Sequence, residues 1–84
     1  MPTISVFYGI TIMMRLKNKE HEPPHIHARY GGEEAAFSIA DGTMKKGSLP
    51  PRAKKLVKEF ILLYQKELLA MWETGNYVRL KGLE

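Results

Sequence analysis

Cysteine is absent from this sequence, so the chain can form neither a disulfide framework nor a thiolate metal site. It also has no apolar run near the ~18 residues of a membrane-spanning helix. Its first residues lack the basic-then-apolar order of a secretory signal. We therefore expect a cytoplasmic protein without a membrane partner, and the 84 residues, 1–84, are enough for a single domain with one small core.

Acidic side chains are missing from residues 44–58, although the chain carries 9 of them elsewhere. Within this segment lie six of the 13 basic residues, namely Lys45, Lys46, Arg52, Lys54, Lys55 and Lys58. Such a concentration of positive charge is typical of an anion-binding surface, with RNA or an acidic protein as the partner. Exposed lysines that are only solvated would give the same pattern, because isolated surface charges contribute little.

All 3 histidines fall within residues 20–27, a stretch that also contains the pair Pro23-Pro24. Each proline fixes its own φ and pushes the preceding residue towards an extended backbone. The prolines should therefore deliver residues 25–30 into a strand in one orientation. On that strand alternate side chains share a face. One face then carries His25, His27 and Arg29, and the other carries Ile26, Ala28 and Tyr30.

Two turn signals set the register of the predicted sheet. Gly31-Gly32 and Asp41-Gly42 are both typical of two-residue hairpin loops. The first loop predicts the pairs His25 with Ser38, Ile26 with Phe37, His27 with Ala36, Ala28 with Ala35, Arg29 with Glu34 and Tyr30 with Glu33. The second loop predicts Met44 opposite Ile39 and Lys45 opposite Ser38. Lys45 would then lie on the same face of the sheet as the histidines. A slip of the strand register by one residue would move these side chains to the opposite face.

Residues 10–17 alternate strictly between the two faces of a further predicted strand. Arg15 and Lys17 from this strand would point towards the face of the histidines, beside Arg29 and Lys45. A shorter strand is expected within residues 1–8. The sequence therefore predicts one open and largely basic face of the sheet.

Residues 51–74 carry apolar side chains at three- and four-residue spacing, which predicts one long helix. Pro51 suits its first position, and Gly75 its C-terminal stop. The expected fold class is α+β, a small curled antiparallel sheet of about four to five strands with two tight hairpins, packed against one long C-terminal helix. Apolar residues beyond one stripe, Leu62, Leu63 and Leu69, predict contact with a terminal segment or a homodimer or partner interface. Residues 77–84 alternate and are expected to add an edge strand or to bind a partner.

The histidines suggest a metal site as one alternative. His25 and His27 are two apart on a strand, so both imidazoles are within reach of one ion, and His21, Glu20 or Glu22 from the preceding loop would complete the ligand set, with His21 as the histidine alternative. Such ligands suit zinc or another transition metal. Because Arg29 and Lys45 would crowd that ion with positive charge, we expect no cofactor and regard an anion as the better ligand.

Acid–base chemistry is the second alternative for the histidines. An imidazole exchanges protons near neutral pH, and neighbouring cations favour its neutral, basic form. With His25 or His27 as base, Arg29 and Lys45 would stabilise charge on a phosphoryl group, as in a metal-independent ribonuclease. The catalytic residues expected on this basis are His25, His27 and Arg29, and the nucleic-acid-binding residues are Arg15, Lys45, Lys46, Arg52, Lys54, Lys55 and Lys58. A solvated sheet face with histidines bonded to loop carbonyls would give the same pattern.

The pattern His21-x-Pro23-Pro24-His25-x-His27 resembles a small bacterial family, the domain of unknown function DUF4160. The resemblance extends to Met1-Pro2-Thr3-Ile4, Tyr30-Gly31, Glu34-Ala35, Leu49-Pro50 and a helix ending near Trp72. Glu20 stands where the family usually has Asp, which keeps a carboxylate on a longer side chain. Members are often encoded beside a second small protein, in an arrangement similar to a toxin–antitoxin pair.

The resemblance therefore implies a partner protein encoded by a neighbouring gene and a toxin-like role, without bringing an established activity. Together with the basic face, it leads to the expectation of a toxin-like component that binds RNA and is a candidate for cleaving it. A non-catalytic module for an acidic protein partner is the main alternative. A metal-binding domain that uses His21, His25 and His27 is the other alternative.

Overall fold

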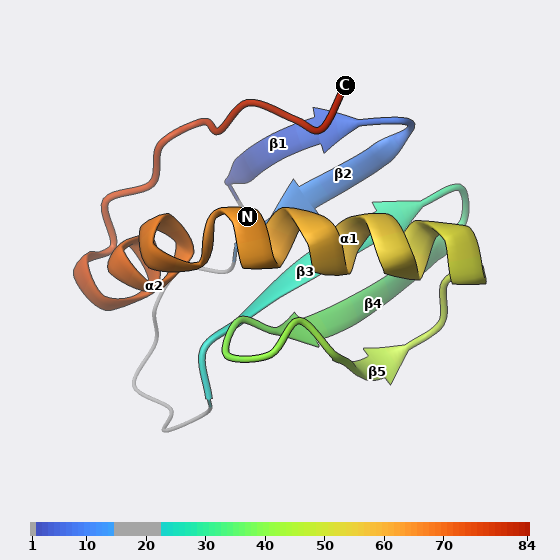
Figure 1. Ribbon diagram of the computed structural model, residues 1–84, viewed down its shortest axis with the longest axis horizontal. Helices are drawn as coiled ribbons and strands as arrows, with labels where there is room; N and C mark the ends of the chain where they lie inside the picture. Colours follow the sequence, from blue (N-terminus) through green and yellow to red (C-terminus); the bar gives the residue numbers. More distant parts are fainter. Residues whose placement is uncertain (1, 15–22) are drawn as a thin grey trace.

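A computed structural model describes residues 2–14 and 23–84 of the chain (Figure 1). One antiparallel sheet has the strand order β1-β2-β3-β4-β5, and two helices follow it in the chain. The strands are β1 (Thr3–Phe7), β2 (Ile10–Met13), β3 (His25–Tyr30), β4 (Glu33–Ser38) and β5 (Met44–Gly47), and the helices are α1 (Pro51–Leu63) and α2 (Gln65–Thr74). The predicted α+β class is confirmed, and Figure 1 shows both helices lying on one face of the sheet.

The β3–β4 hairpin has the predicted register, from His25 opposite Ser38 to Tyr30 opposite Glu33. Gly31, with φ of 61°, supplies the positive φ that such a loop requires. The apolar residues that the register places on one face, Ile26, Ala28, Ala35 and Phe37, are all buried. Local turn chemistry and period-two alternation agree here, so the histidines lie on the face away from the helices.

The loop between β4 and β5 is wider than the predicted two-residue turn. The backbone N–H of Ser38 donates to the Thr43 carbonyl at 2.8 Å, and that of Gly42 donates to the Ser38 carbonyl at 2.8 Å. The Asp41 carboxylate accepts from the Thr43 backbone N–H at 3.0 Å and from the Thr43 hydroxyl at 2.7 Å. An aspartate that bonds two residues ahead stabilises its own turn, so Thr43 belongs to the loop rather than to the strand.

The register of β5 differs from the prediction as a consequence. The observed pairs are Ala35 with Gly47, Ala36 with Lys46, and Phe37 with Met44, and an irregularity interrupts the ladder between Ala36 and Phe37. The predicted pairs, Met44 with Ile39 and Lys45 with Ser38, are therefore wrong. Lys45 lies at this irregularity, which has the two-against-one character of a β-bulge.

One long helix was also a wrong prediction, because the helix is interrupted at Tyr64, whose φ is −112° and ψ is 27°. No proline or glycine marks this position in the sequence. Tertiary contacts hold the break. The Tyr64 hydroxyl donates to the Lys81 carbonyl at 2.8 Å. The Gln65 amide donates to the carbonyls of Ile39 and Ala40 at 2.8 and 2.7 Å. The break lets α2 turn away from the axis of α1 (Figure 1), and the Trp72 ring of α2 lies 5.0 Å from the ring of His25, the first residue of β3.

Residues 77–84 run beside β1 without forming a regular strand (Figure 1). The backbone N–H of Leu80 donates to the Ile4 carbonyl at 2.8 Å, a single contact of the kind expected from an edge strand. Gly82 passes so close to β1 that a Cβ atom there would lie 2.7 Å from Phe7 Cβ. The segment therefore covers the free edge of the sheet.

The hydrophobic core lies between the sheet and the helices. Phe7 and Phe60 stack at its centre, with ring centroids 5.0 Å apart. Leu69 packs against this core, and so do Tyr77, Leu80 and Leu83 of the segment 77–84. Leu62 and Leu63 remain exposed, and their role in a homodimer stays a prediction.

Candidate functional site

The face of the sheet away from the helices has a pocket of 500 Å³ around the two histidines of β3. Its walls are formed by Pro23, Pro24, His25, His27, Ala36, Ser38, Lys45 and Lys46. Four residues of the predicted site, His25, His27, Lys45 and Lys46, are thereby brought together. We call this the histidine pocket.

His25 is held in place by contacts on several sides. Its Nδ1 lies 3.0 Å from the Pro23 carbonyl oxygen, which can only accept a hydrogen bond, so Nδ1 carries the proton of this pair. The Pro24 carbonyl accepts from the Ile39 backbone N–H at 3.1 Å, which ties the double proline to the end of β4. The Trp72 ring of α2 lies 5.0 Å from the His25 ring. Trp72 of α2 thus contacts the pocket's own histidine.

His27 faces a carboxylate that the sequence reasoning assigned only to Arg29. Its Nδ1 lies 3.5 Å from Glu34 Oε2, and its side chain is 12% exposed. Glu34 lies diagonally across the hairpin from His27, which opposes Ala36, and diagonal neighbours are within reach of long side chains. The His25 and His27 rings meet edge to face at 5.2 Å. The two imidazoles are therefore adjacent but have different partners, a carbonyl and a carboxylate.

Arg29, the third expected catalytic residue, has a different position from the histidines. It makes the predicted cross-strand pair with Glu34, with Nη2 and Oε1 3.3 Å apart. Arg29 is exposed and is not among the residues that line the histidine pocket. Glu34 therefore offsets at His27 part of the positive charge that Arg29 was expected to bring.

Lys45 and Lys46 both line the histidine pocket, although the predicted register of β5 is wrong. Opposite Ala36, Lys46 shares the face of the histidines, and the irregularity beside it brings Lys45 to the same pocket. A regular strand would send two consecutive side chains to opposite faces. The bulge therefore doubles the positive charge at this site.

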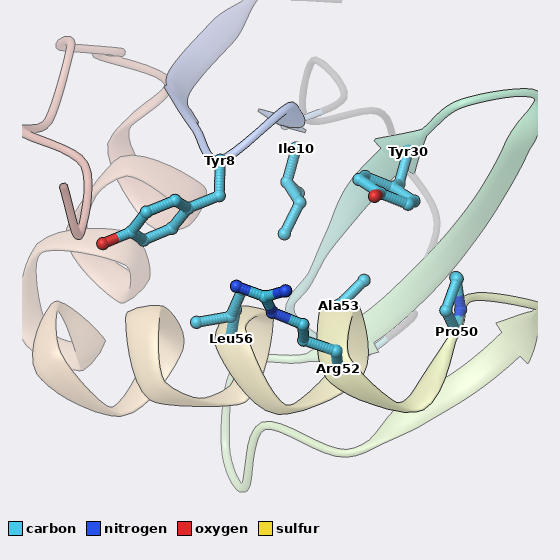
Figure 2. A pocket seen from close by; sticks show the side chains of 7 residues that line it. All are labelled: Tyr8, Ile10, Tyr30, Pro50, Arg52, Ala53 and Leu56. Atoms are coloured by element: carbon cyan, nitrogen blue, oxygen red, sulfur yellow. The ribbon is translucent and has the colours of Figure 1, made fainter.

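The remaining cations of the basic segment lie elsewhere among the described residues. A second pocket, of 450 Å³, is lined by Phe37, Gly42, Thr43, Met44, Lys54, Lys55 and Lys58. Arg52 lines a third pocket, of 370 Å³, with Tyr8, Ile10, Tyr30, Pro50, Ala53 and Leu56 (Figure 2). Arg15 and Lys17 fall outside the described residues. The basic segment thus contributes to three pockets rather than to one continuous face.

The alternative metal site has one member outside the described residues, because His21 falls in the range 15–22. Within residues 2–14 and 23–84, no group of three or more His, Cys, Asp or Glu side chains is placed to hold a metal ion. The polar side chains that line the pocket are two imidazoles, two ammonium groups and the Ser38 hydroxyl, and ammonium groups repel a cation. The described donor set therefore suits an anion better than a metal.

Tyr8 is a residue of potential functional interest that the sequence reasoning missed. It occupies the turn between β1 and β2 with a φ of 50°, an uncommon conformation for a bulky side chain. A signal was available, because the dipeptide Tyr8-Gly9 separates two alternating segments, as a two-residue hairpin loop does. The sequence does not predict that Tyr8 lies near Tyr30 and Arg52, because the three residues come from separate elements.

Comparison with known proteins gives one match. The family model described as Domain of unknown function (DUF4160) matches residues 9–73. No curated protein and no solved structure matches the chain. Neither α1 nor α2, the helices in the part of the chain that the structure describes, has the length and apolarity of a bilayer-spanning segment.

Proposed function

Because the chain belongs to the DUF4160 family, a domain of unknown function, we propose its role from the geometry of the site alone. The protein is an RNA-binding domain that holds phosphate groups of the RNA backbone in the histidine pocket. One observation carries the proposal: His25, His27, Lys45 and Lys46 line a single open pocket of 500 Å³. The toxin-like role in a two-gene module is the biological setting that this activity would serve.

The chemistry of the pocket supports a phosphate ligand. The ammonium groups of Lys45 and Lys46 are compact point charges, which bind phosphates and release counterions from the nucleic acid. The two imidazoles lie beside them in the wall of the same pocket. One of the side-chain partners described above for the histidines is a carboxylate. It belongs to Glu34, which pairs with both Arg29 and His27. The pocket therefore presents donors to an anion on an open sheet surface.

The two imidazoles also suit cleavage of the bound RNA, which we include in the proposal. His25 takes the proton of a 2′-hydroxyl, whose oxygen attacks the adjacent phosphorus. The bond from phosphorus to the 5′-oxygen breaks, and His27 gives that oxygen a proton, which leaves a 2′,3′-cyclic phosphate. Glu34 stabilises a positively charged His27, which supports the assignment of His27 as the acid.

Binding is tested by measuring the affinity for a fluorescent single-stranded RNA across a salt series. The variant Lys45→Gln/Lys46→Gln should weaken binding and reduce the slope of log affinity against log salt by about 1.4, that is roughly 0.7 for each lost phosphate contact. The control Lys66→Gln/Lys81→Gln removes the same charge from exposed residues outside the three pockets. Equal slopes in both double variants would refute a specific role for the pocket.

Cleavage is tested separately with His25→Gln and His27→Gln. Both should still bind RNA, since the lysines remain, but should produce no 2′,3′-cyclic phosphate ends. Products formed at the parent rate by both variants would rule out the histidines as the catalytic pair while leaving RNA binding in place.

A second candidate function is supported by the lysine pocket of α1. Lys54, Lys55 and Lys58 surround a pocket that also has Phe37 and Met44 among its walls. Apolar walls ringed by cations suit an acidic protein segment, such as one from the small protein encoded by a neighbouring gene. Lys54→Glu/Lys58→Glu should then abolish co-purification of that protein, and His25→Gln should not.

A further inference from the structure

A third pocket, the tyrosine pocket, lies where the β1–β2 and β3–β4 turns meet the start of α1. It has a volume of 370 Å³, and the residues of its wall that matter here are Tyr8, Ile10, Tyr30, Arg52 and Leu56. Figure 2 shows the two tyrosine rings on either side of Ile10, with the Arg52 guanidinium directed towards the same space. The pocket thus combines aromatic rings, an apolar floor and one planar cation.

The two tyrosines do not serve the core. Tyr8 is 49% exposed and Tyr30 is 40% exposed, whereas Ile10 between them is 1% exposed. Exposed aromatic rings over a buried aliphatic floor leave apolar surface open to a flat ligand. Core packing therefore does not account for tyrosine at these two positions.

Tyr8 also occupies an unfavourable backbone conformation. Its φ of 50° and the φ of 78° at Gly9 give a hairpin loop in which both residues have positive φ. Such loops favour asparagine at the first position, because a short polar side chain tolerates this region. A strained residue that packs nothing in the core points to a binding role for its side chain.

The lining of the pocket narrows the class of ligand. None of the described residues that line it is acidic, and Arg52 is its only cation. A planar ring with an attached phosphate uses all of these features, since bases stack on tyrosine and the guanidinium binds phosphate or stacks on the base. A bare phosphate would leave the aromatic rings unused, and an aliphatic ligand would leave Arg52 unused.

We propose that the tyrosine pocket binds one unpaired base of a single-stranded RNA, stacked against Tyr30 and Tyr8, with the adjoining phosphate on Arg52. This inference rests on the RNA-binding function proposed above and assigns it a preference for unpaired bases. The pocket adjoins the Tyr30 end of β3, and the histidine pocket adjoins the His25 end, about 17 Å away along the strand. Because the tyrosine pocket lies on the helix side of the sheet and the histidine pocket on the opposite face, one RNA chain would have to pass around the sheet to contact both.

The test uses a single-stranded RNA oligonucleotide that carries one 2-aminopurine, whose fluorescence reports stacking, and a duplex of the same sequence. The parent should bind the single strand more tightly than the duplex. Tyr30→Leu should weaken single-strand binding by about 5- to 100-fold, the usual effect of losing one stacking ring. Tyr30→Phe and Tyr8→Phe keep the ring and should bind as the parent does.

Tyr8→Asn separates binding from folding. Asparagine suits the positive φ, so this variant should melt at or above the parent temperature and still bind the single strand more weakly. A variant that melts normally and binds normally would remove Tyr8 from the proposal.

The outcomes also separate this inference from the function on which it rests. A parent protein that binds neither RNA form overturns the RNA-binding function and this inference with it. A parent that binds both forms equally, with Tyr30→Leu and Tyr8→Asn unchanged, overturns only the tyrosine pocket. Adenosine monophosphate that displaces the RNA base at concentrations equal to those of the oligonucleotide would identify a free-nucleotide site and would also overturn the proposal.

Discussion

At the scale of single residues, Asp41 makes the stability of the β4–β5 loop depend on the pH of the solution. Hydrogen bonds from the Thr43 side chain and backbone, with a smaller contribution from the nearby Lys45 charge, hold the pKa of the Asp41 carboxyl below its ordinary value of 3.8. A depressed pKa in the folded protein means that the ionised carboxylate stabilises the fold. This contribution is complete above the ordinary pKa and is lost as pH falls through the lower, folded value.

Asp41→Ala should therefore lower the melting temperature near neutral pH, and the difference from the parent should shrink as the solution is made strongly acidic. Thermal melts recorded over a pH series measure this. A difference that is constant from neutral to acidic pH would show that the carboxylate charge is not involved. Thr43→Val is the matched variant, since it removes the hydroxyl and keeps the backbone donor.

Gly47 is a residue that the register of β5 makes irreplaceable. Its φ is 88°, and a Cβ atom there would lie 2.2 Å from the Glu34 carbonyl oxygen. Gly47→Ala should destabilise the protein by about 2 kcal/mol or more, from backbone strain together with the clash. Urea denaturation measures the change. Gly32→Ala is the control, because nothing lies within 4 Å of a Cβ atom there, and a comparable loss in both variants would contradict the expectation.

At the scale of elements, the Gln65 amide is one of two side-chain groups that hold the junction of α1 and α2, the other being the Tyr64 hydroxyl. Gln65 Nε2 donates to the carbonyls of Ile39 and Ala40, so it ties the start of α2 to the end of β4. Gln65→Ala should cost about 1–3 kcal/mol, because carbonyls that the amide satisfies lose their donor. The measurement is the free energy of unfolding in urea. Gln65→Glu is the comparison, since it keeps the length of the side chain but replaces the donor with an acceptor.

An unchanged free energy of unfolding in both Gln65 variants would show that the amide does not hold the junction, which would leave packing and the Tyr64–Lys81 hydrogen bond. Loss in both would also affect the site, because α2 carries Trp72 against His25. RNA affinity of the same variants therefore tests whether the helix break positions the histidine pocket.

The elements differ in how far they were predictable. The β3–β4 hairpin was predicted residue by residue, because Gly31-Gly32 and the alternation on both sides specify the same register. The β4–β5 hairpin was predicted with the wrong pairs, because the Asp41 side chain selects a wider loop than the Asp-Gly dipeptide suggests. The helix break was not predictable from periodicity, because its partners are Lys81, Ile39 and Ala40, far away in the sequence.

At the scale of the whole molecule, residues 77–84 protect the edge strand β1. Leu80 donates its N–H to the Ile4 carbonyl, and the Glu84 carboxylate accepts from the Tyr8 N–H at the β1–β2 turn. Leu80→Pro removes that donor and should expose the edge, which lowers the melting temperature and promotes self-association. Light scattering and thermal melts measure both effects.

Leu80→Ala serves as the control, because it keeps the N–H and loses only apolar packing. It should lower the melting temperature without self-association. Self-association of both variants to the same extent would show that the apolar contact, rather than the backbone bond, closes the edge.

The sequence by itself determined the α+β class, the DUF4160 membership and the pairing of the histidine strand with its neighbour. These follow from turn residues, alternation and a local motif, which act over a few residues. Only the tertiary structure decided that Lys45 and Lys46 both reach the histidines, that the other cations lie at separate pockets, and that Tyr8, Tyr30 and Arg52 meet. The physical reason is that a bulge, a side-chain bond across the fold and the meeting of two turns with a helix depend on contacts between distant segments, which no local pattern encodes.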